Sequence, residues 1–203
     1  MNIICIGKNF VAHAEEMGEQ IPDDLVFFTK PDICAVKNSK PFYIPDWSTR
    51  MDYEVEIVVK INKVGKNIAE EFAHKYYAEI GIGIDFTERN IQKNLKENGL
   101  PWERAKVFDG AAYFGKFVPM SQINDINDVN FRLEQNGNVV QKSNSSLMIY
   151  SVDKIIAEVS KYITLRIGDL IYTGTPEGIG PVHEEDTLAC FLEDECLLKF
   201  DIK

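Results

Sequence analysis

Residues 50–61, RMDYEVEIVVKI, alternate between polar and apolar side chains with the two-residue period of a β-strand. This period places Asp52, Glu54 and Glu56 on one face of the strand and the tyrosine, valine and isoleucine side chains on the other. Like charges along one face of a strand repel one another. The segment therefore has two interpretations: the carboxylates and Lys60 form the solvated face of an edge strand, or the carboxylates surround a cation.

The cation interpretation requires a further ligand, and residues 80–85, IGIGID, offer one. A buried apolar strand that ends in Asp85 delivers this carboxylate to the rim of a sheet. A hard divalent ion such as Mg²⁺ accepts a set of ligands made only of oxygen. The alternative role for Asp85 is to cap the helix expected at residues 87–98.

Two further pairs of residues have a spacing that suits catalysis or binding. His13 and Glu16 stand three residues apart on a short helix that we expect Asn9 to cap, so the carboxylate can orient an imidazole that acts as a general base. Arg89 and Gln92 share a face of the helix at residues 87–98 and can hold a substrate carboxylate. In both cases the alternative is an ordinary pair of surface side chains.

A lysine and a glycine-rich turn complete the candidate residues. Lys106 lies in the largely apolar segment WERAKVFDGAAYFG, where it is either a functional cation or a lysine whose charged end reaches solvent. Thr175 lies in the turn of GDLIYTGTPEGIG, where its hydroxyl and the backbone N–H groups can face an anion. The glycines of this turn do not match the dinucleotide or P-loop fingerprints, so no nucleotide is implied.

Strands outnumber helices in the expected secondary structure. Asn136-Gly137 predicts a hairpin, DLIYTG, TLACFLE and CLLKFDI predict late strands, and SVDKIIAEVSKYI predicts an amphipathic helix. IAEEFAHKYYAEI predicts another helix. This pattern favours a mixed β or α+β fold over a doubly wound sheet. A chain of 203 residues with 45% hydrophobic residues predicts a single domain over residues 1–203.

Composition bears on partners and compartment. The chain has 22 Lys and Arg against 32 Asp and Glu, and the resulting charge of −10 disfavours both nucleic acid and an anionic membrane as partners. No apolar run approaches membrane-span length, and the run before Lys8 is too short for the core of a signal peptide. The four cysteines form no CxxC pair. We therefore expect a cytoplasmic protein with reduced thiols.

Five segments, in order, resemble the fumarylacetoacetate hydrolase family, most closely its small acylpyruvase and oxaloacetate decarboxylase-like members. They are GKNFVAHAEEMG with its HxxE pair, MDYEVEIVVKI with its ExE pair, GIGIDFTERNIQ, GLPWERAKVFDGAAYFGKFVP and LRIGDLIYTGTPEGIGPV. The last of these matches a specific signature. The chain departs from the family pattern at Lys8, where Arg is frequent, and at Asn90, where Asp is frequent.

The resemblance implies a fumarylacetoacetate hydrolase-like β-roll with a few peripheral helices, a homodimer, and Mg²⁺ or Mn²⁺ bound by Glu54, Glu56 and Asp85. His13 and Glu16 would be a water-activating dyad on a mobile N-terminal segment. The remaining implied roles are a cation beside the metal for Lys106 and substrate contacts for Arg89, Gln92 and Thr175.

The resemblance also implies a small 2-oxo acid as substrate. Because the HxxE dyad is present, we expect metal-dependent hydrolysis of the C–C bond of an acylpyruvate-type 2,4-dioxo acid to pyruvate and a carboxylic acid. The alternatives are oxaloacetate decarboxylation or tautomerisation and a 2-hydroxyhepta-2,4-diene-1,7-dioate isomerase-like activity. In a non-catalytic alternative, the acidic strand binds a structural cation.

Overall fold

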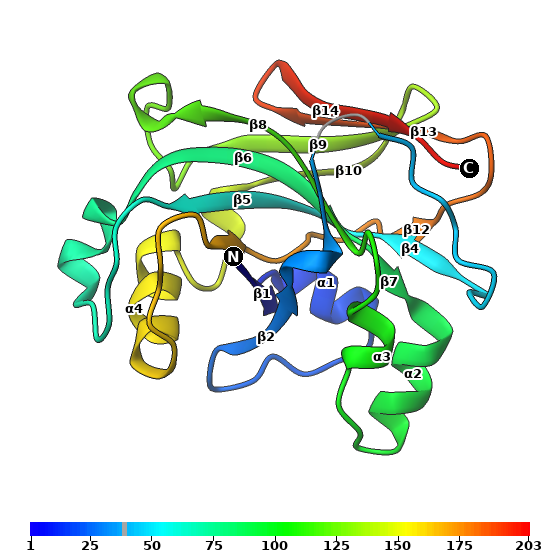
Figure 1. The fold of residues 1–203 in the computed structure, drawn as a ribbon, viewed down its shortest axis with the longest axis horizontal. Helices are drawn as coiled ribbons and strands as arrows, with labels where there is room; N and C mark the ends of the chain where they lie inside the picture. Colours follow the sequence, from blue (N-terminus) through cyan, green and yellow to red (C-terminus); the bar gives the residue numbers. More distant parts are fainter. Residues whose placement is uncertain (38–39) are drawn as a thin grey trace.

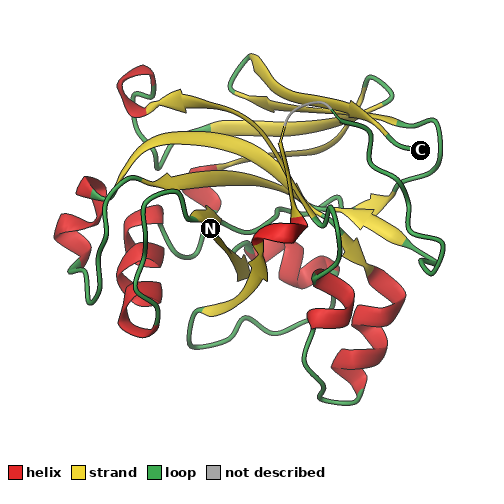
Figure 2. Ribbon diagram, viewed as in Figure 1, coloured by secondary structure: helices red, strands yellow, loops and turns green. Residues whose placement is uncertain are grey.

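The computed structural model describes residues 1–37 and 40–203, and strands dominate this part of the chain (Figures 1 and 2). The strands are β1 (Asn2–Gly7), β2 (Val26–Pro31), β3 (Ala35–Lys37), β4 (Met51–Tyr53), β5 (Val55–Ile61), β6 (Tyr77–Asp85), β7 (Thr87–Glu88), β8 (Ala112–Pro119), β9 (Asn130–Gln135), β10 (Asn138–Asn144), β11 (Leu170–Tyr172), β12 (Gly180–Pro181), β13 (Thr187–Leu192) and β14 (Glu195–Asp201). The α-helices are α1 (Val11–Glu16), α2 (Arg89–Glu97), α3 (Glu103–Lys106) and α4 (Val152–Tyr162). Short 3₁₀ turns are η1 (Asp32–Cys34), η2 (Glu70–Lys75), η3 (Met120–Gln122) and η4 (Ser145–Leu147).

The largest sheet has seven strands in the order β2-β1-β11-β5-β6-β8-β3. Its strands pair antiparallel except where β1 lies beside β11 and β3 beside β8. The N-terminal strand therefore lies inside the sheet, next to a strand from the last part of the chain. Long strands that include β5, β6 and β8 curl across the molecule, as Figure 1 shows.

A four-stranded sheet in the order β10-β9-β13-β14 covers one face of β5, β6 and β8 (Figure 1). The main hydrophobic core fills the space between the two sheets, where Ile57, Val59 and Ile82 of the large sheet belong to the same buried cluster as Leu133 and Leu188. Two packed sheets with helices at the periphery confirm the expected mixed β or α+β fold.

The opposite face of the large sheet carries the candidate site. A smaller apolar cluster there includes Ile3, Val58 and Tyr172. Side chains two residues apart on a strand point to the same face, so Glu54 and Glu56 share this face with Val58. This face therefore carries both the two glutamates and an apolar patch, because Glu54, Glu56 and Val58 follow one another at two-residue spacing.

The chain changes sheets at Glu54. β4 belongs to a three-stranded sheet in the order β12-β4-β7, whereas β5 begins one residue after Glu54 in the seven-stranded sheet. The interpretation of this segment as a solvated edge strand is wrong, because β5 lies between β11 and β6. Asp52, Glu54 and Glu56 are only 0–4% exposed.

Local signals in the sequence predict most of these elements. The hairpin between β9 and β10 is confirmed, with positive φ at Asn136 (55°) and Gly137 (79°). The helix expected at residues 151–163 is also confirmed as α4, whose N-cap Ser151 accepts a hydrogen bond from the Lys154 N–H.

Other local expectations are wrong. The helix expected across residues 68–80 is limited to the 3₁₀ turn η2, because the chain from Tyr77 pairs with β5 and forms β6. Asn9 does not cap α1; its side chain donates to the carbonyls of Tyr150 and Thr173. Asp85 does not cap α2, since Glu88 accepts the hydrogen bond from the first turn.

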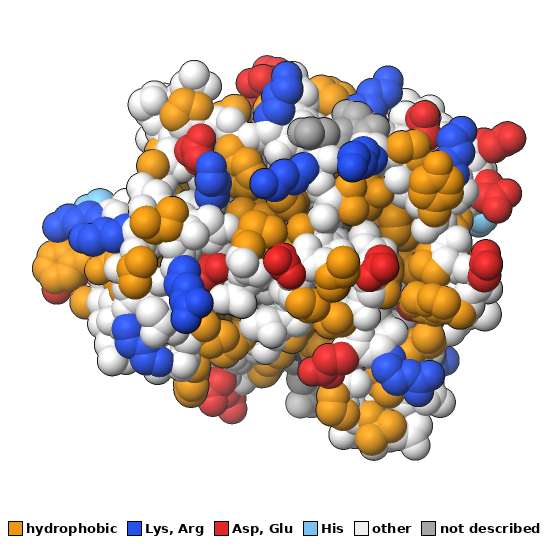
Figure 3. All heavy atoms as spheres, viewed as in Figure 1, with side chains coloured by type: hydrophobic (Ala, Val, Ile, Leu, Met, Phe, Trp, Pro, Cys, Tyr) orange, Lys and Arg blue, Asp and Glu red, His pale blue; other side chains and the backbone are white. Residues whose placement is uncertain are grey.

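The distribution of charged side chains can be seen on one face of the molecule. On the face shown in Figure 3, acidic and basic side chains are interspersed, so the charge of −10 does not gather there as one acidic patch. Among the described residues, we find no helix with the length and apolar character needed to cross a membrane.

Candidate active site

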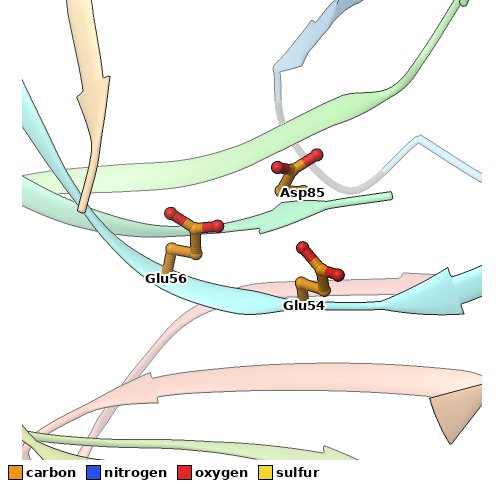
Figure 4. A group of neighbouring side chains, drawn as sticks. All are labelled: Glu54, Glu56 and Asp85. Carbon is orange, nitrogen blue, oxygen red and sulfur yellow. The ribbon is translucent and has the colours of Figure 1, made fainter. Parts of the chain in front are cut away.

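Three carboxylates meet where β5 and β6 lie side by side. Figure 4 shows Glu54, Glu56 and Asp85 projecting to the same side of the two strands. One oxygen of each carboxylate lies within 4.8 Å of the others, and all three residues are buried. The backbone N–H of Asp85 donates to the carbonyl oxygen of Glu54 at 2.9 Å, which holds the two residues beside each other. The structure thus brings together the three predicted ligands.

Two glycines allow this close packing. Gly83 pairs with Glu56 across the two strands, and a Cβ at Gly83 would lie 2.4 Å from the Tyr113 carbonyl oxygen. Gly174 has a φ of 100°, which favours glycine, and its N–H donates to Glu56 Oε2 at 2.6 Å. The turn after β11 therefore supplies a backbone hydrogen bond that fixes one ligand.

Two buried lysines balance part of the negative charge. Lys106 Nζ lies 2.6 Å from Glu54 Oε2 and 2.9 Å from Asp85 Oδ2. Lys30 Nζ lies 2.5 Å from Asp85 Oδ1 and donates to the Ala111 carbonyl oxygen at 2.8 Å. Lys106 was predicted, but Lys30 was not, because LVFFTK shows only one lysine at the end of an apolar strand.

The two glutamates of the ExE pair differ in their charge environment. Burial opposes ionisation of Glu54, but Lys106 and Arg89 outweigh it and lower the pKa of this carboxyl well below its ordinary value. Burial, followed by the negative charges of Asp85 and Glu54, raises the pKa of Glu56 well above its ordinary value. Among the described residues, no side-chain cation forms an ion pair with Glu56.

These observations fit a divalent cation. Glu56 is a buried carboxylate that lacks a side-chain counter-charge in the described chain, and its neighbours offer only oxygen atoms as further ligands. A hard cation such as Mg²⁺ or Mn²⁺ accepts such a donor set. A cation here would keep Glu56 ionised and relieve the repulsion that the alternating sequence creates.

Arg89 is held in place by three side chains. Its guanidinium donates to Asp52 Oδ2 at 2.8 Å and to Glu54 Oε1 at 2.5 Å, and also to Gln92 Oε1 at 2.6 Å. Asp52, the first carboxylate of the alternating segment, also accepts from Arg50 Nε at 2.9 Å. Arg89 and Gln92 are thus neighbours as predicted, and Asp52 anchors the arginine rather than joining the ligand group.

Thr175 lies in the turn after β11, and its hydroxyl accepts a hydrogen bond from Gln141 Nε2 at 3.0 Å. The Gln141 side chain also accepts from the Val55 N–H at 2.9 Å, at the point where the chain changes sheets. Gln141 thereby ties the turn that carries Thr175 to the strand that carries the glutamates. No sequence signal distinguished this residue from other glutamines.

His13 and Glu16 approach each other without a strong hydrogen bond. His13 Nδ1 lies 3.5 Å from Glu16 Oε2 and, within the described chain, has no hydrogen-bond partner. Glu16 instead accepts from the Gly178 N–H at 3.1 Å. Burial lowers the pKa of His13 below its ordinary value, so its imidazole is neutral and able to accept a proton near pH 7.

All of the predicted site residues except Glu16 line one small cavity of about 40 Å³. Phe28, Lys96 and Trp102 are among its other lining residues. A cavity of this size holds no more than a water molecule or two. A molecule larger than this would fit only after a movement of the lining, and the parts of the lining outside the sheets include the α1 segment, α2 and α3.

The chain is similar in sequence to known proteins of one family. Residues 2–202 match the family described as fumarylacetoacetate (FAA) hydrolase C-terminal. Oxaloacetate tautomerase FAHD1, mitochondrial, from Mus musculus is 36% identical over 202 residues, which cover 100% of this chain and 91% of the relative. Oxaloacetate tautomerase YcgM from Escherichia coli is 33% identical over 196 residues, covering 96% and 90% of the two chains.

A solved structure shares the fold over the whole chain. The fumarylpyruvate hydrolase from Pseudomonas aeruginosa in complex with Mn²⁺ and pyruvate superposes with a TM-score of 0.94 at 31% identity, covering 100% of this chain and 89% of that chain. The match spans every strand that carries a site residue. This chain therefore belongs to the fumarylacetoacetate hydrolase family.

Proposed function

We propose that this chain catalyses the keto–enol tautomerisation of oxaloacetate with Mg²⁺ or Mn²⁺ bound by Glu54, Glu56 and Asp85. The observation that carries the proposal is the ammonium of Lys106 placed inside a buried acidic group that suits a divalent cation. The choice of oxaloacetate is supported by the two relatives, both of which are oxaloacetate tautomerases. Acylpyruvate hydrolysis, ranked first from the sequence, becomes the second candidate.

Tautomerisation moves one proton between two atoms of the substrate. The C3–H bond breaks, its electron pair forms the C2=C3 double bond, and the carbonyl pair moves onto O2, which is then protonated. When bound, the metal ion acts as a Lewis acid that polarises the 2-oxo group. The protein must supply a base for C3, a donor near O2 and groups that hold the carboxylates.

We assign the base to His13. Its imidazole lines the cavity, and because burial lowers its pKa, it is neutral near pH 7. After it takes the C3 proton, Glu16 at 3.5 Å lies close enough to stabilise the imidazolium. The imidazolium then returns the proton to O2, so the enzyme ends the cycle unchanged.

Lys106 provides the charge that favours the enolate. Burial opposes its ionisation, but Asp85 and Glu54 raise its pKa above the ordinary value, so it remains an ammonium. A fixed cation in a buried site stabilises developing negative charge far more than the same cation in water. We therefore assign Lys106 as the hydrogen-bond donor to O2 as charge develops there.

Arg89, Gln92 and Thr175 are proposed to bind the carboxylate next to the 2-oxo group. All three line the cavity. Arg89 donates to Gln92 and to the proposed ligand Glu54, so substrate would exchange with contacts that already exist. Asp52 keeps the guanidinium in place during this exchange, because its own contact with Arg89 lies outside the acidic triad.

Hydrolysis of an acylpyruvate is the second candidate, and the neutral, buried imidazole of His13 favours it. The same base can deprotonate a water that attacks the distal carbonyl. Both reactions pass through a pyruvate-type enolate, so the same cations serve each. They differ in whether water or the C3 proton lies next to the imidazole.

Purified protein tests the choice directly. With Mg²⁺ or Mn²⁺ present, loss of the ultraviolet absorbance of enol-oxaloacetate should accelerate, and a chelator should abolish the effect. Acetylpyruvate and fumarylpyruvate serve as hydrolysis substrates, with release of pyruvate as the readout. Cleavage of an acylpyruvate without any acceleration of tautomerisation would contradict the proposal and place hydrolysis first. Homodimer formation stays a prediction that sedimentation velocity measures.

A further inference from the structure

A carboxylate of the protein itself bridges two lysines at the entrance to the cavity. Glu19 follows α1, and its Oε2 lies 2.9 Å from Lys8 Nζ. Its other oxygen, Oε1, accepts from Lys96 Nζ at 2.6 Å. The three side chains are only 20–25% exposed. Neither lysine contacts the acidic triad, so the pair forms a second cationic position in the lining.

Two members of this bridge, Glu19 and Lys96, line both an inner and an outer space. Glu19 and Lys96 line the small inner cavity that contains the acidic triad. They also line an outer groove of about 460 Å³, along with Arg89 and Gln92. A molecule that extends from the triad into the groove would therefore lie beside the Glu19 carboxylate and Lys96.

Lys96 has a second contact beyond Glu19, and the backbone of Lys8 is in an unusual conformation. The Lys96 ammonium lies 5.2 Å from the centre of the Trp102 ring, which in turn packs edge-on against Phe28 at 6.0 Å. Lys8 has a φ of 59°, a left-handed conformation that is sparsely populated for residues other than glycine. Such strain concentrates at binding sites.

The two lysines stabilise the ionised form of the Glu19 carboxyl. Burial opposes ionisation of Glu19, but hydrogen bonds from Lys96 and Lys8 outweigh it and lower the pKa of this carboxyl. Glu19 thus shows how the lysine pair receives a carboxylate. The Glu19 carboxylate is also one of the side chains that line the small inner cavity.

We propose that Lys8 and Lys96 form a subsite for the second carboxylate of a dicarboxylic 2-oxo acid, and that Glu19 occupies this subsite until substrate displaces it. The inference rests on the proposed function in placing the 2-oxo end at the triad. It adds the part of the site that distinguishes a four-carbon diacid from a monocarboxylate such as pyruvate. The second carboxylate of a diacid replaces the Glu19 carboxylate at the two lysines. A monocarboxylate has no second carboxylate, so displacement of Glu19 would leave both ammonium groups without an ion pair.

Two inert acids isolate this subsite from catalysis. L-malate and L-lactate both offer a carboxylate and a neighbouring hydroxyl to the triad, but only malate has a second carboxylate, and neither can tautomerise. We expect titration calorimetry on the Mn²⁺-loaded protein to show tighter binding of malate. Lys96→Met and Lys8→Met should each weaken malate binding about 10-fold and change lactate binding less than about 2-fold.

Matched variants complete the test. Lys161→Met removes an exposed lysine in the last turn of α4, which lines neither the inner cavity nor the outer groove, and it should leave both affinities unchanged. Glu19→Gln removes the competing charge and should tighten malate binding several-fold without a similar gain for lactate. If the two lysine variants weaken malate and lactate equally, the bridge only holds the structure together, and the subsite proposal is overturned.

The outcome is separable from that of the proposed function. Lysine-dependent discrimination between malate and lactate, together with a lack of oxaloacetate turnover, would retain the subsite and reject the tautomerase. Oxaloacetate turnover with a malate-to-lactate ratio that neither lysine variant alters would retain the tautomerase and reject the subsite.

Discussion

The site consists of two regions that are built in opposite ways. We define the floor as the acidic triad together with Lys30 and Lys106. These residues lie on or against β5 and β6. The side chains of the two lysines, Glu54 and Asp85 are 0–6% exposed, and Glu56 as a whole residue is 1% exposed. The cover, residues 10–20, contains only a six-residue helix without a side-chain N-cap. Its His13 and Glu16 side chains are 13% and 34% exposed.

The difference indicates a division of labour. Groups that stabilise charge are fixed in the core, where a low dielectric makes each of them effective. The groups proposed to move protons are carried by a segment whose first residue, Phe10, is buried in the main core, and which beyond it makes polar contacts such as Glu16 with Gly178 and Glu19 with Lys8. We therefore expect substitutions in the floor to impair metal binding or stability, and substitutions in the cover to alter the reaction.

The largest effect is expected from Glu54→Gln. Loss of one ligand charge should raise the Kd for Mn²⁺ more than about 100-fold and reduce turnover to the uncatalysed rate, since metal stabilisation is worth several kcal/mol. Calorimetry and the tautomerase assay measure the two effects. Glu79→Gln, at an exposed ion pair with Lys60, is the control that should retain both. Normal Mn²⁺ binding by Glu54→Gln would remove this residue from the ligand set.

His13→Ala should lower tautomerisation and hydrolysis by about 10²- to 10⁴-fold, the usual range for a lost general base. Decarboxylation of oxaloacetate should fall much less, because Lys106 and the metal still stabilise the enolate. Mn²⁺ affinity should hardly change. Rates of the three reactions under saturating metal test this separation, with His183→Ala, an exposed histidine, as the control. Full tautomerase activity in His13→Ala would mean that the cover does not supply the base.

Lys30→Met should destabilise the fold by about 3–5 kcal/mol, because it removes one of the two buried lysines that pair with Asp85 and leaves the Ala111 carbonyl without its ammonium donor. Lys60→Met breaks an exposed pair and should cost less than about 1 kcal/mol. Urea unfolding followed by circular dichroism gives both values. Equal midpoints for the two variants would contradict the view that the floor is part of the stabilising core.

Ligand binding should affect the two regions differently. Amide hydrogen exchange in residues 11–17 should slow about 10-fold when oxalate and Mn²⁺ are present, whereas exchange in β5 and β6 is already slow without them. Mass spectrometry of peptic fragments resolves the two segments. Exchange in residues 11–17 that is equally slow with and without oxalate would show that the cover is as rigid as the floor.

The smallest effect concerns pH. Burial lowers the pKa of His13 in the folded chain, so between this value and the ordinary 6.5 the unfolded chain binds more protons. Stability from this group is therefore complete above pH 6.5 and is lost as pH falls through the folded pKa. Urea midpoints at pH 7.5 and 5.5 should differ more in wild type than in His13→Ala. Identical differences would show that His13 is exposed in solution.

The floor could be predicted from the sequence to the extent that alternation reveals it. ExE spacing on a strand and an apolar run ending in Asp85 are local patterns, and the structure brings these three residues together. Lys30 and Gln141 could not be found in this way. Their partners lie far away in the sequence, at Asp85 and at Thr175, and only the pairing of distant strands brings them into contact.

The helix N-caps show a second limit of prediction from the sequence. Asn9 and Asp85 are residue types favoured at N-caps and precede α1 and α2, but the N-cap positions belong to Phe10 and Glu88, and tertiary contacts use the side chains of Asn9 and Asp85. Glu88 caps α2 although glutamate is not a favoured cap, because its buried carboxylate also accepts from the backbone of Thr49 and Arg50. The N-cap preference of a residue type does not predict its role where the side chain forms hydrogen bonds or ion pairs with residues distant in the sequence.

The pairing of β1 with β11 has a consequence for how the protein is made. It joins residues 3–5 to residues 170–172, so a chain growing from the ribosome cannot complete its largest sheet until β11 has emerged. Gly174, whose N–H holds Glu56, emerges two residues later. Pairing across so much of the sequence slows folding, and the apolar strand β1 remains without one of its partners throughout most of synthesis. The proposed metal site can therefore form only after β11 and Gly174 have emerged, and translation products truncated before β11 should neither bind Mn²⁺ nor escape proteolysis.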